Sequence, residues 1–491
     1  MPSDRSAPTI AIIGTGHSGL CVAMQLVRSG VRDFTLFEKA ERIGGTWRDN
    51  TYPGAACDSP AFAYCFSFEQ KTDWSRKWAE QPEILRYMER CADRYGLWPH
   101  IRTGTEITTA RFDEERLCWK LEAASGERFE ADVLVSGVGQ LSRPRIPEIP
   151  GLADFEGAAF HSARWDHAVD LEGKAVALVG SAASAVQIVP AIAEEVGHLR
   201  VFQRSPNWVA PKNDRVYPAW EQRLYDAVPG AAKLYRGWLW LQHELRFPII
   251  KKNRLLTRLA HRITERHLAE QVADPELRAA LTPTFALGAK RLLISDDYYP
   301  ALTRENVTLE TDGIARVEGD TVVTASGERH RADVMVFATG FDTTDFLAPM
   351  EVVGRGGQRL RDAWAEGAEA YLGVTVAGFP NLFLMYGPNT NLGHNSILFM
   401  IECQTRYILD CLAKMRERGI AAIDLKPEVQ ARYNASIAAE LEDTVWRAVD
   451  SSWYQTEAGR ITNNWPGTTV RYWWQTREAD LSRYERLMPT E

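Results

Sequence analysis

Two residues of opposite charge stand at matching positions in two glycine-rich parts of the chain. Glu38 lies 24 positions after Gly14, and Arg204 lies 24 positions after Gly180. A carboxylate at this position of a nucleotide-binding turn accepts hydrogen bonds from a ribose diol and repels a 2′-phosphate, whereas a guanidinium pairs with that phosphate. The pattern predicts that the first part binds FAD and the second binds NADPH, so that the chain holds two redox cofactors.

The first glycine-rich turn lies where a dinucleotide-binding turn is expected, between a strand and a helix. The apolar run at residues 9–13 predicts the strand, and the pattern over residues 20–29 predicts the helix. Between them, Gly14 makes a tight turn, Gly16 lets the backbone approach a pyrophosphate, and Gly19 allows close packing. The candidate FAD-binding residues of this part are Gly14, Gly16, Ser18, Gly19 and Glu38.

The second glycine-rich turn has the same context. Residues 175–179 predict a strand, residues 186–195 a helix, and residues 199–202 a further strand that leads to Arg204. One departure from the pattern is Ala182, which replaces the middle glycine, so its methyl group is expected to hold the pyrophosphate farther away. The candidate NADPH-binding residues are Gly180, Ser181, Ser184, Ala185, Arg204 and Ser205.

A repeated pattern indicates how the two parts are arranged. Residues 131–137 and 332–340 read as similar buried strands, and they bracket about 200 residues. We therefore expect an α/β fold with two Rossmann-like dinucleotide-binding domains, the second inserted in the first. The chain would leave the first domain near Gly137, pass a proline-rich link at residues 143–151, and return near Gly340.

The predicted domain limits follow from this arrangement. Residues 1–142 and 335–491 form the discontinuous FAD-binding domain, residues 152–334 form the NADP-binding domain, and residues 143–170 form the link between them. Inside the second domain, residues from about 218 to about 286 are rich in Trp and Arg and read as a helical insertion. This insertion is a candidate lid over a substrate cavity.

Charge and cysteine content exclude several classes of protein. The formal net charge of -8 argues against nucleic-acid binding, because no broad excess of Lys and Arg is available to neutralise phosphates. The seven cysteines are an odd number and include no C-x-x-C pair. They argue for reduced thiols in the cytoplasm, and against a disulfide framework, a metal site or a dithiol redox centre.

No segment of the chain is expected to direct export or to cross a membrane. Residues 1–8 are short and polar, which leaves no room for a secretory signal. The most apolar later segment, residues 238–250, is interrupted by His243, Glu244, Arg246 and Pro248, so it cannot span a bilayer. We favour an amphipathic core helix; the alternatives are a helix that faces a lipid surface or one that lines a substrate entrance.

A third motif lies between the two nucleotide-binding parts, where electrons must pass if both hold redox cofactors. It reads Phe-x-Gly-x-x-x-His-x-x-x-Trp-Asp and consists of Phe155, Gly157, His161, Trp165 and Asp166. This spacing resembles the fingerprint of the type I Baeyer–Villiger monooxygenases, a family of class B flavin-dependent monooxygenases. Taken singly, each of these residues would only shape a turn or pack the joint between the domains.

The resemblance implies an activity. Enzymes of that family use FAD, NADPH and O2 to insert one oxygen atom next to a ketone carbonyl, through a C4a-peroxyflavin, and they produce an ester or a lactone. The implied partners are therefore a small-molecule ketone and O2, with no nucleic acid. The oligomeric state is left open.

The resemblance also implies which residues surround the reacting centre. The run from Gly45, Thr46 and Trp47 to Asp58 would wrap the flavin, with Tyr64 as a further contact. Arg291 would stabilise the peroxyflavin, and Asp58 would hold that arginine in place.

Three further residues complete the predicted site. Lys290 would assist with the NADPH phosphate, and Trp453, in the run Ser451-Ser452-Trp453-Tyr454, would contact nicotinamide or substrate. Ser396 is a candidate cap for a helix over residues 397–416, whose N-terminus would point at the flavin.

Two other functions are compatible with two nucleotide sites. A flavin monooxygenase that oxygenates nitrogen or sulfur shares the layout, although the Trp165-Asp166 ending of the motif favours the ketone enzyme. A flavin- and NADPH-binding redox sensor or electron-transfer protein is the alternative without an organic substrate. Disulfide-reductase chemistry is disfavoured by the missing C-x-x-C, and serine hydrolysis by the place of Ser18 in a phosphate-binding turn.

Overall fold

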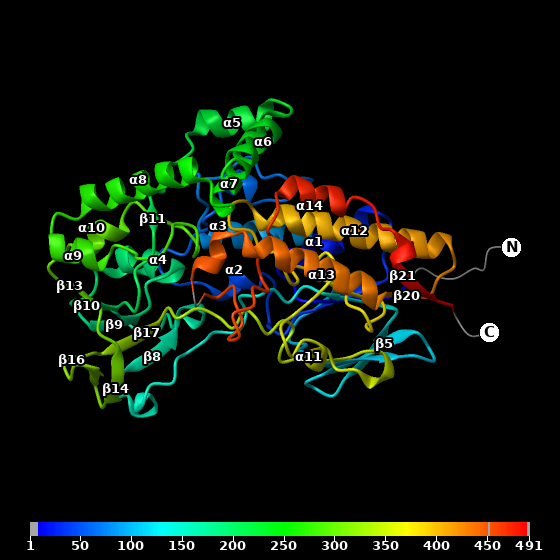
Figure 1. Cartoon of the computed structure of the whole chain (residues 1–491), viewed down its shortest axis with the longest axis horizontal. Coiled ribbons are helices and arrows are strands. Elements are labelled where there is room, and N and C mark those ends of the chain that lie inside the picture. Colours follow the sequence, from blue (N-terminus) through cyan, green and yellow to red (C-terminus); the bar gives the residue numbers. More distant parts are fainter. Residues whose placement is uncertain (1–7, 450–451, 489–491) are drawn as a thin grey trace.

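The computed structural model describes residues 8–449 and 452–488, and it has two lobes, each built on a parallel sheet of five strands (Figure 1). Residues 1–7, used above to argue against a secretory signal, and Ser451 lie outside the described residues. Within the described part of the chain, no helix combines the length and the apolarity needed to cross a membrane. The expected α/β fold with two Rossmann-like sheets is confirmed.

The first sheet belongs to the predicted FAD-binding domain. Alternate residues of a strand point to opposite faces. Ile10 and Ile12 therefore pack against helices, while Ala11 and Ile13 pack against a mainly antiparallel sheet. The parallel strands, in spatial order, are β19 (Leu382–Leu384), β7 (Val133–Ser136), β1 (Ile10–Ile13), β2 (Phe34–Phe37) and β3 (Ile101–Arg102). The covering helices are α1 (His17–Arg28), α3 (Gln81–Arg94) and α12 (Ile397–Glu417), and the other sheet contains β18 (Glu351–Val353), β4 (Ile107–Asp113), β5 (Cys118–Ala123) and β6 (Arg128–Ala131).

The second sheet repeats this plan in the other lobe. Its parallel strands are β13 (Val307–Glu310), β10 (His198–Phe202), β9 (Ala175–Val179), β17 (Val334–Phe337) and β8 (Ala158–His161). Two helices, α4 (Ala183–Ile192) and α10 (Tyr298–Leu302), pack with Val176 and Leu178 of β9 on one face. On the other face, Ala177 packs against β14 (Ile314–Glu318), β15 (Thr321–Thr324) and β16 (Arg329–Arg331).

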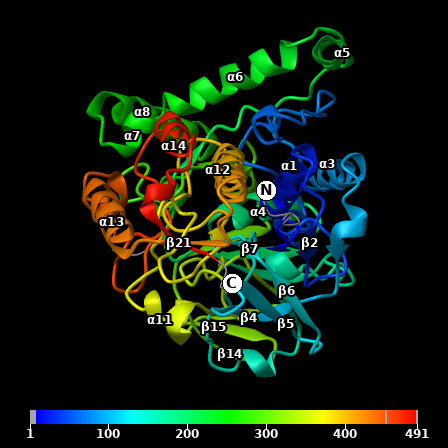
Figure 2. The ribbon, with the colours of Figure 1, turned by 90° about the vertical axis from the view of Figure 1, so that its right-hand side faces the viewer.

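The predicted helical insertion contains five helices, of which α5, α6, α7 and α8 lie along one edge of the molecule (Figure 2). They are α5 (Ala219–Ala227), α6 (Ala231–Glu244), α7 (Phe247–Ile250), α8 (Arg254–Gln271) and α9 (Pro275–Ala280). Short strands β11 (Val209–Ala210) and β12 (Leu293–Ile294) lie where the chain enters and leaves this part.

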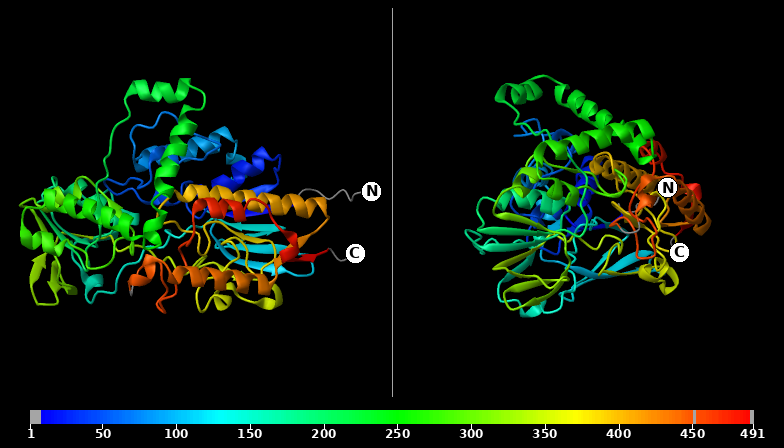
Figure 3. Two further views of the ribbon diagram at one scale, coloured as in Figure 1. Left: turned by 45° about the horizontal axis from the view of Figure 1, so that its top comes forward. Right: turned by 60° about the vertical axis from the view of Figure 1, so that its left-hand side comes forward.

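The remaining elements lie in the first lobe, mostly near the C-terminal end of the chain. They are α2 (Thr46–Asp49), α11 (Leu360–Ala363), α13 (Pro427–Glu442), α14 (Thr469–Gln475), β20 (Ala422–Leu425) and β21 (Tyr484–Leu487). Figure 3 shows α12, the long orange helix, running along this lobe.

Two crossover segments join the lobes and are hydrogen-bonded to each other. The Arg145 N–H donates to the Gly340 carbonyl at 2.9 Å, and the Asp342 N–H donates to the Arg143 carbonyl at 3.0 Å. The predicted boundary at residue 335 is corrected by the strand pairing, because 335 falls inside β17, which pairs with β8 and β9 of the second sheet. The return near Gly340 agrees with this pairing. The predicted link at 143–170 likewise contains β8, a strand of the second sheet.

Two local predictions differ from the structure. Helices α1 and α4 begin three residues earlier than predicted, at His17 and Ala183, because the last residues of each glycine-rich turn already form the first helical turn. Ser396 occupies the N-cap position of α12, but its side chain makes no capping hydrogen bond, so the predicted cap is wrong. All seven cysteines are buried free thiols.

Candidate active site

The first glycine-rich turn leaves space for a pyrophosphate. A Cβ atom on Gly14 would meet the Gly137 carbonyl oxygen at 2.7 Å, so only glycine fits this turn. A Cβ atom on Gly16, in contrast, would meet only the Cα of Gly45, at 4.0 Å. The first turn of α1 contains no acidic residue and no capping side chain, which leaves its N–H groups free for phosphate oxygens. This backbone cradle fits FAD.

Glu38 is buried at the carboxyl end of β2, where the sequence placed a ribose-binding acid. Its Oε2 accepts hydrogen bonds from the Thr15 N–H and hydroxyl at 3.1 and 2.6 Å. Its Oε1 lies 2.8 Å from Nη1 of Arg48. Arg48 therefore neutralises Glu38 and holds it in one orientation, a pairing that the motif did not predict.

Trp47, Tyr64 and His17 form one aromatic group beside this turn. Trp47 Nε1 donates to the Tyr64 hydroxyl at 3.1 Å, and the His17 ring meets the Tyr64 ring edge-on at 5.2 Å. Burial lowers the pKa of His17 to about 3 and raises the pKa of Tyr64, so both stay neutral at pH 7. His17 Nε2 is buried and has no hydrogen-bond partner among the described residues. A cofactor beside it would supply that partner. Ser18 is buried in the first turn of α1, and Thr46 begins α2 directly after Gly45.

The second glycine-rich turn has a comparable shape. A Cβ atom on Gly180 would meet the Ala338 carbonyl oxygen at 2.4 Å, and Ala182 is exposed at the N-cap of α4. The Ser181 hydroxyl donates to the Ser205 carbonyl at 3.0 Å, which joins this turn to the end of β10. Ser184 and Ala185 lie in the first turn of α4, which again has no acidic residue.

Three residues, two of them basic, gather after the end of β10. Lys290 Nζ donates to the Ser205 hydroxyl at 3.4 Å, and the side chain of Arg204 is exposed next to them. Burial lowers the pKa of Lys290, and the neighbouring Arg204 charge lowers it further. Two cations this close repel each other until an anion lies between them, which fits a nucleotide 2′-phosphate.

Asp58 and Arg291 meet across the joint between the lobes. Arg291 Nε donates a hydrogen bond to Oδ2 of Asp58 at 2.7 Å, and Nη2 forms an ion pair with the same oxygen at 2.5 Å. The Asp58 charge raises the pKa of Arg291, which therefore keeps its positive charge. The described residues give Nη1 no hydrogen-bond partner, so its two hydrogens remain available to an anionic oxygen.

Two tyrosines lie close to this ion pair. Burial raises the pKa of Tyr454 to about 12, and it also raises that of Tyr386, although the Arg291 charge opposes both shifts. The phenols are therefore neutral and add no negative charge beside Arg291. Trp453 packs against Tyr454 with ring centroids 4.6 Å apart, and its carbonyl accepts a hydrogen bond from the Thr343 hydroxyl at 2.7 Å.

The loop that leads to Asp58 is attached to the other lobe. The Tyr52 hydroxyl donates to Oε1 of Gln187 on α4 at 2.9 Å, and a Cβ atom on Gly54 would meet the Gln187 carbonyl oxygen at 2.6 Å. The Thr51 hydroxyl lies 2.8 Å from Nε2 of His167, just after the fingerprint motif. These contacts fix the relative position of Asp58 and Arg291.

The fingerprint residues lie at the crossover, not at the ion pair. The Ala163 N–H donates to His161 Nδ1 at 3.0 Å, so the ring proton is on Nε2, which donates to the Gly340 carbonyl at 3.0 Å. A Cβ atom on Gly157 would meet the Asp333 carbonyl oxygen at 2.3 Å. The absence of a side chain at Gly157 therefore allows the start of β8 to lie close to the start of β17. Phe155 and Trp165 pack in the second lobe, and Asp166 is exposed and accepts the Ala168 N–H at 2.9 Å. No hydrogen bond or ion pair within the described residues joins the five to Asp58 or Arg291.

Glu244 connects the insertion to the loop that precedes α12. Its Oε1 accepts the Thr469 N–H at 2.7 Å, and its Oε2 accepts the Thr469 hydroxyl at 2.7 Å and the Asn395 amide at 2.9 Å. His394 Nε2 lies 3.4 Å from the same oxygen. Burial opposes ionisation of Glu244, but these contacts outweigh it and lower the pKa to about 2. The buried carboxylate therefore ties α6 to the N-terminal end of α12.

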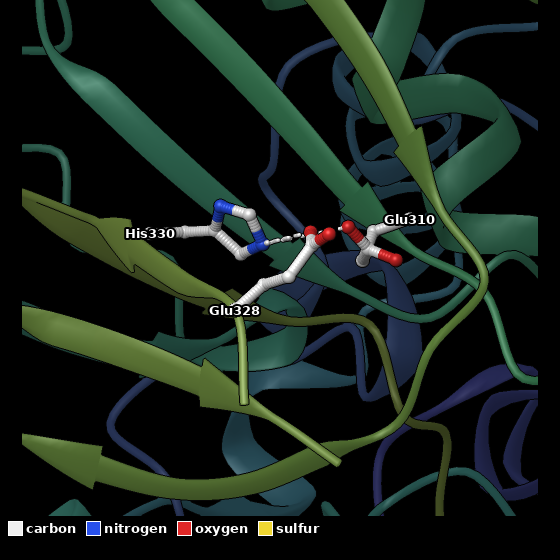
Figure 4. A group of neighbouring side chains, drawn as sticks. All are labelled: Glu310, Glu328 and His330. Atoms are coloured by element: carbon white, nitrogen blue, oxygen red, sulfur yellow. Dashed lines mark ion pairs between the residues drawn. The ribbon is translucent and has the colours of Figure 1, made fainter. Parts of the chain in front are cut away.

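A group of two carboxylates and a histidine lies at the opposite edge of the second sheet (Figure 4). His330 Nε2 lies 3.5 Å from a carboxylate oxygen of Glu310 and 3.5 Å from one of Glu328. Arg200 already faces Glu310 at 3.7 Å, so part of the negative charge is neutralised by the protein itself. This group joins β13 to β16, outside the proposed reaction centre.

Residues that the sequence did not reveal contribute to the site. Arg48, Gln187 and Tyr386 carry no motif of their own, and Glu244 lies in the insertion, where the family resemblance is weakest. The place of Arg48 directly after Trp47 is the one signal that could have drawn attention to it.

Comparisons with known proteins place the chain among flavin-dependent monooxygenases. The model of the flavin-binding monooxygenase-like family matches residues 7–350. A Baeyer-Villiger monooxygenase of Streptomyces coelicolor is 43% identical over 482 residues, which cover 98% of this chain and 93% of that protein. A Baeyer-Villiger monooxygenase of Pseudomonas aeruginosa is also 43% identical, over 97% of this chain and 90% of that protein.

Solved structures agree over the whole length. An oxidised steroid monooxygenase bound to NADP is 31% identical and superposes with a TM-score of 0.86, covering 98% of this chain and all of that one. The closed form of cyclohexanone monooxygenase is 28% identical, with a TM-score of 0.88, and the match covers 98% of this chain and 99% of that one.

Proposed function

The chain belongs to the flavin-binding monooxygenase-like family and is an NADPH-dependent flavoprotein monooxygenase, and we propose that it is a Baeyer–Villiger enzyme that inserts one oxygen atom of O2 next to a ketone carbonyl. The observation that carries this proposal is the Asp58–Arg291 pair, which lies at the joint between two nucleotide-binding turns and directs free guanidinium hydrogens away from the carboxylate.

FAD, when bound, supplies the chemistry of storing two electrons and activating oxygen. The proposed FAD residues are those of the first turn and its loop: Gly14, Gly16, Ser18, Gly19, Glu38, Gly45, Thr46, Trp47 and Tyr64. Glu38 would accept hydrogen bonds from the ribose, and the α1 N-terminus would hold the pyrophosphate.

NADPH would bind in the second turn. The α4 N-terminus would hold its pyrophosphate, with Gly180, Ser181, Ser184 and Ala185 around it. Arg204, Ser205 and Lys290 would bind the 2′-phosphate, which selects NADPH over NADH. Trp453 would cover the nicotinamide or the substrate.

Arg291 would stabilise the negative charge that develops on oxygen during attack on the ketone. A fixed cation in a site that excludes water stabilises such charge without having to reorganise. Asp58 holds the guanidinium by a hydrogen bond from Nε and an ion pair with Nη2 and so fixes its direction, and the neutral phenols of Tyr386 and Tyr454 help to exclude water. In the final step a neighbouring carbon would move from the carbonyl carbon to the oxygen atom that is retained, while the O–O bond breaks and the other oxygen atom leaves to become water. One C–C bond is thus replaced by one C–O bond, which gives an ester or a lactone.

We also propose that the enzyme works in the cytoplasm. All seven cysteines are buried free thiols, even though several lie within the same lobe. Cysteines that remain reduced are typical of proteins in reducing compartments. The substrate would be a small ketone that can reach the joint between the lobes.

Replacement of Arg291 by alanine tests the proposal. Arg291→Ala is expected to keep NADPH-driven bleaching of the flavin absorbance under nitrogen and to lose oxygenated product in air. Arg291→Lys is the matched control, because it retains the charge but lacks the planar guanidinium that contacts Asp58 through both Nε and Nη2. We expect it to form product at a rate between those of the wild type and the alanine variant. If Arg291→Ala formed as much ester per NADPH consumed as the wild type does, Arg291 would have no role in the mechanism.

A further inference from the structure

The exposed apolar residues of this protein are concentrated on one surface. Fourteen of the seventeen large hydrophobic side chains that are exposed in the described residues lie in residues 216–263 or on α14. On α6 they are Leu234, Trp238 and Leu241, and Leu245 follows at its C-cap; the spacing of three or four residues places them on one face. Leu234 is 79% exposed, and Trp238 is 54% exposed. Such a concentration marks an interaction surface.

The neighbouring helix α8 presents a related face. Leu255 and Leu259 are exposed, and Arg258 and Arg262 lie between and beside them on the same side of the helix. The opposite side of α8, with Thr264, His267 and Leu268, is buried. Figure 2 shows α5, α6 and α8 along the same edge of the molecule, and α14 is joined to α6, where Trp240 Nε1 donates to the Thr469 hydroxyl at 3.0 Å.

The charge of this surface is opposite to that of the whole protein. The chain has a formal net charge of -8, yet residues 231–263 contain a single acid, Glu244, which is buried. On α8, the ion pairs within the described residues join His261 to Glu265 and Arg266 to Glu270, which leaves Arg254, Arg258 and Arg262 without an acidic partner. The basic residues of the segment are Lys233, Arg236, Arg246, Lys251, Lys252, Arg254, Arg258 and Arg262.

We propose that this surface, formed by the outward faces of α5, α6 and α8, binds the surface of an anionic lipid bilayer. Helices that lie in the plane of a membrane combine Trp and Leu on one face with Lys and Arg beside it. The apolar side chains would enter the headgroup region, and the arginines of α8 would pair with lipid phosphates. The protein would rest on the bilayer without crossing it, since no helix in the described residues could span one.

Charge favours a lipid surface over a second copy of this chain. In a two-fold dimer the same patch meets itself, so Arg254, Arg258 and Arg262 of one copy would face the same cations of the other. The exposed acids of α5 and α8 are Asp226, Glu265 and Glu270, which already contact Thr72, His261 and Arg266, so these contacts would have to break before the acids could relieve that repulsion. A bilayer with anionic headgroups supplies the complementary charge.

Vesicle sedimentation of the FAD-loaded protein tests the proposal. We expect binding to vesicles that mix phosphatidylcholine with phosphatidylglycerol, little binding to phosphatidylcholine alone, and weaker binding as salt is raised. Each basic residue near an anionic surface contributes about fivefold to binding, so the triple variant R254Q/R258Q/R262Q should bind on the order of 100-fold more weakly. Leu234→Glu and Trp238→Glu should also reduce binding.

Matched controls separate this effect from a general loss of charge or apolar surface. Arg128→Gln removes a charge whose side chain is 81% exposed on β6, and Met488→Glu changes an exposed apolar residue after β21. Both should bind vesicles like the wild type, and all variants should keep the wild-type rate of NADPH oxidation. Equal binding to both kinds of vesicle, or wild-type binding by the triple variant, would overturn the proposal. So would a dimer in sedimentation velocity that Trp238→Glu converts to monomer.

Discussion

Replacement of Glu244 by glutamine should loosen the connection between the insertion and the N-terminal end of α12. The carboxylate is 10% exposed, and its two oxygens accept hydrogen bonds from Thr469 and Asn395. Glutamine has nearly the same shape, but its amide has one acceptor oxygen in place of two. Whichever way the amide is turned, an N–H group then faces a donor, and a buried hydrogen bond is lost.

The pKa of Glu244 gives the size of the effect. Its pKa falls from 4.5 to about 2 in the folded protein. Since one pKa unit corresponds to about 1.4 kcal/mol, the ionised side chain contributes about 3 kcal/mol of stability. A folded-state pKa below the unfolded value gives stability that is complete above pH 4.5 and is lost as the pH falls toward 2. The advantage of the wild type over Glu244→Gln should therefore shrink below pH 4.5.

Hydrogen exchange followed by mass spectrometry measures the loss where it occurs. A local loss of about 3 kcal/mol corresponds to exchange roughly 100-fold faster at pH 7. We expect this change in peptides that contain Thr469 or residues 393–400. Glu89→Gln is the control, because its ion pair with Arg42 is exposed and contributes little. Wild-type protection of these peptides in Glu244→Gln, or a loss spread evenly over the chain, would refute the reasoning.

Two further predictions concern the NADPH site. Ala182→Gly removes the methyl group that faces the proposed pyrophosphate, so the KM for NADPH should fall about fivefold with kcat unchanged, while Ala183→Gly should leave KM as it is. An unchanged KM in Ala182→Gly would show that the methyl group does not hinder binding. Arg204→Ala should raise the KM for NADPH by 10- to 100-fold, on the order expected for a charged hydrogen bond, and leave that for NADH unaltered. An equal effect on both nucleotides would place Arg204 away from the 2′-phosphate.

The nucleotide turns could be predicted from the sequence because their signals are local. A strand, a glycine-rich turn and a helix follow one another within a few residues, and the structure shows both arrangements, at Gly14 and at Gly180. Helices α1 and α4 nevertheless begin three residues before their predicted starts. The last residues of each turn already have helical geometry, although their N–H groups remain free. The sequence pattern predicts the kind and order of these elements well, and it predicts the ends of the helices poorly.

Contacts between distant parts of the chain could not be predicted. Glu244 and Thr469 are 225 positions apart, and Arg291 and Asp58 are 233 apart. Only the family resemblance linked Arg291 to Asp58, and no pattern linked Glu244 to anything. Likewise, residues 332–340 read as a buried strand, but its pairing with β8 and β9 decides the sheet to which that strand belongs. Ser396 is a residue type that often caps helices, yet its hydroxyl accepts no hydrogen bond from the first turn of α12, and its own N–H donates to Oδ1 of Asn395.

Mass spectrometry of the products tests the central claim most directly. The purified enzyme would be incubated with NADPH, ¹⁸O-labelled O2 and a mixed panel of ketones and thioethers. The account predicts an ester or a lactone that carries one labelled oxygen, and no such product from Arg291→Ala. Sulfoxides alone would assign the enzyme to heteroatom oxygenation, and NADPH consumed to peroxide across the whole panel, with no labelled organic product, would contradict the account.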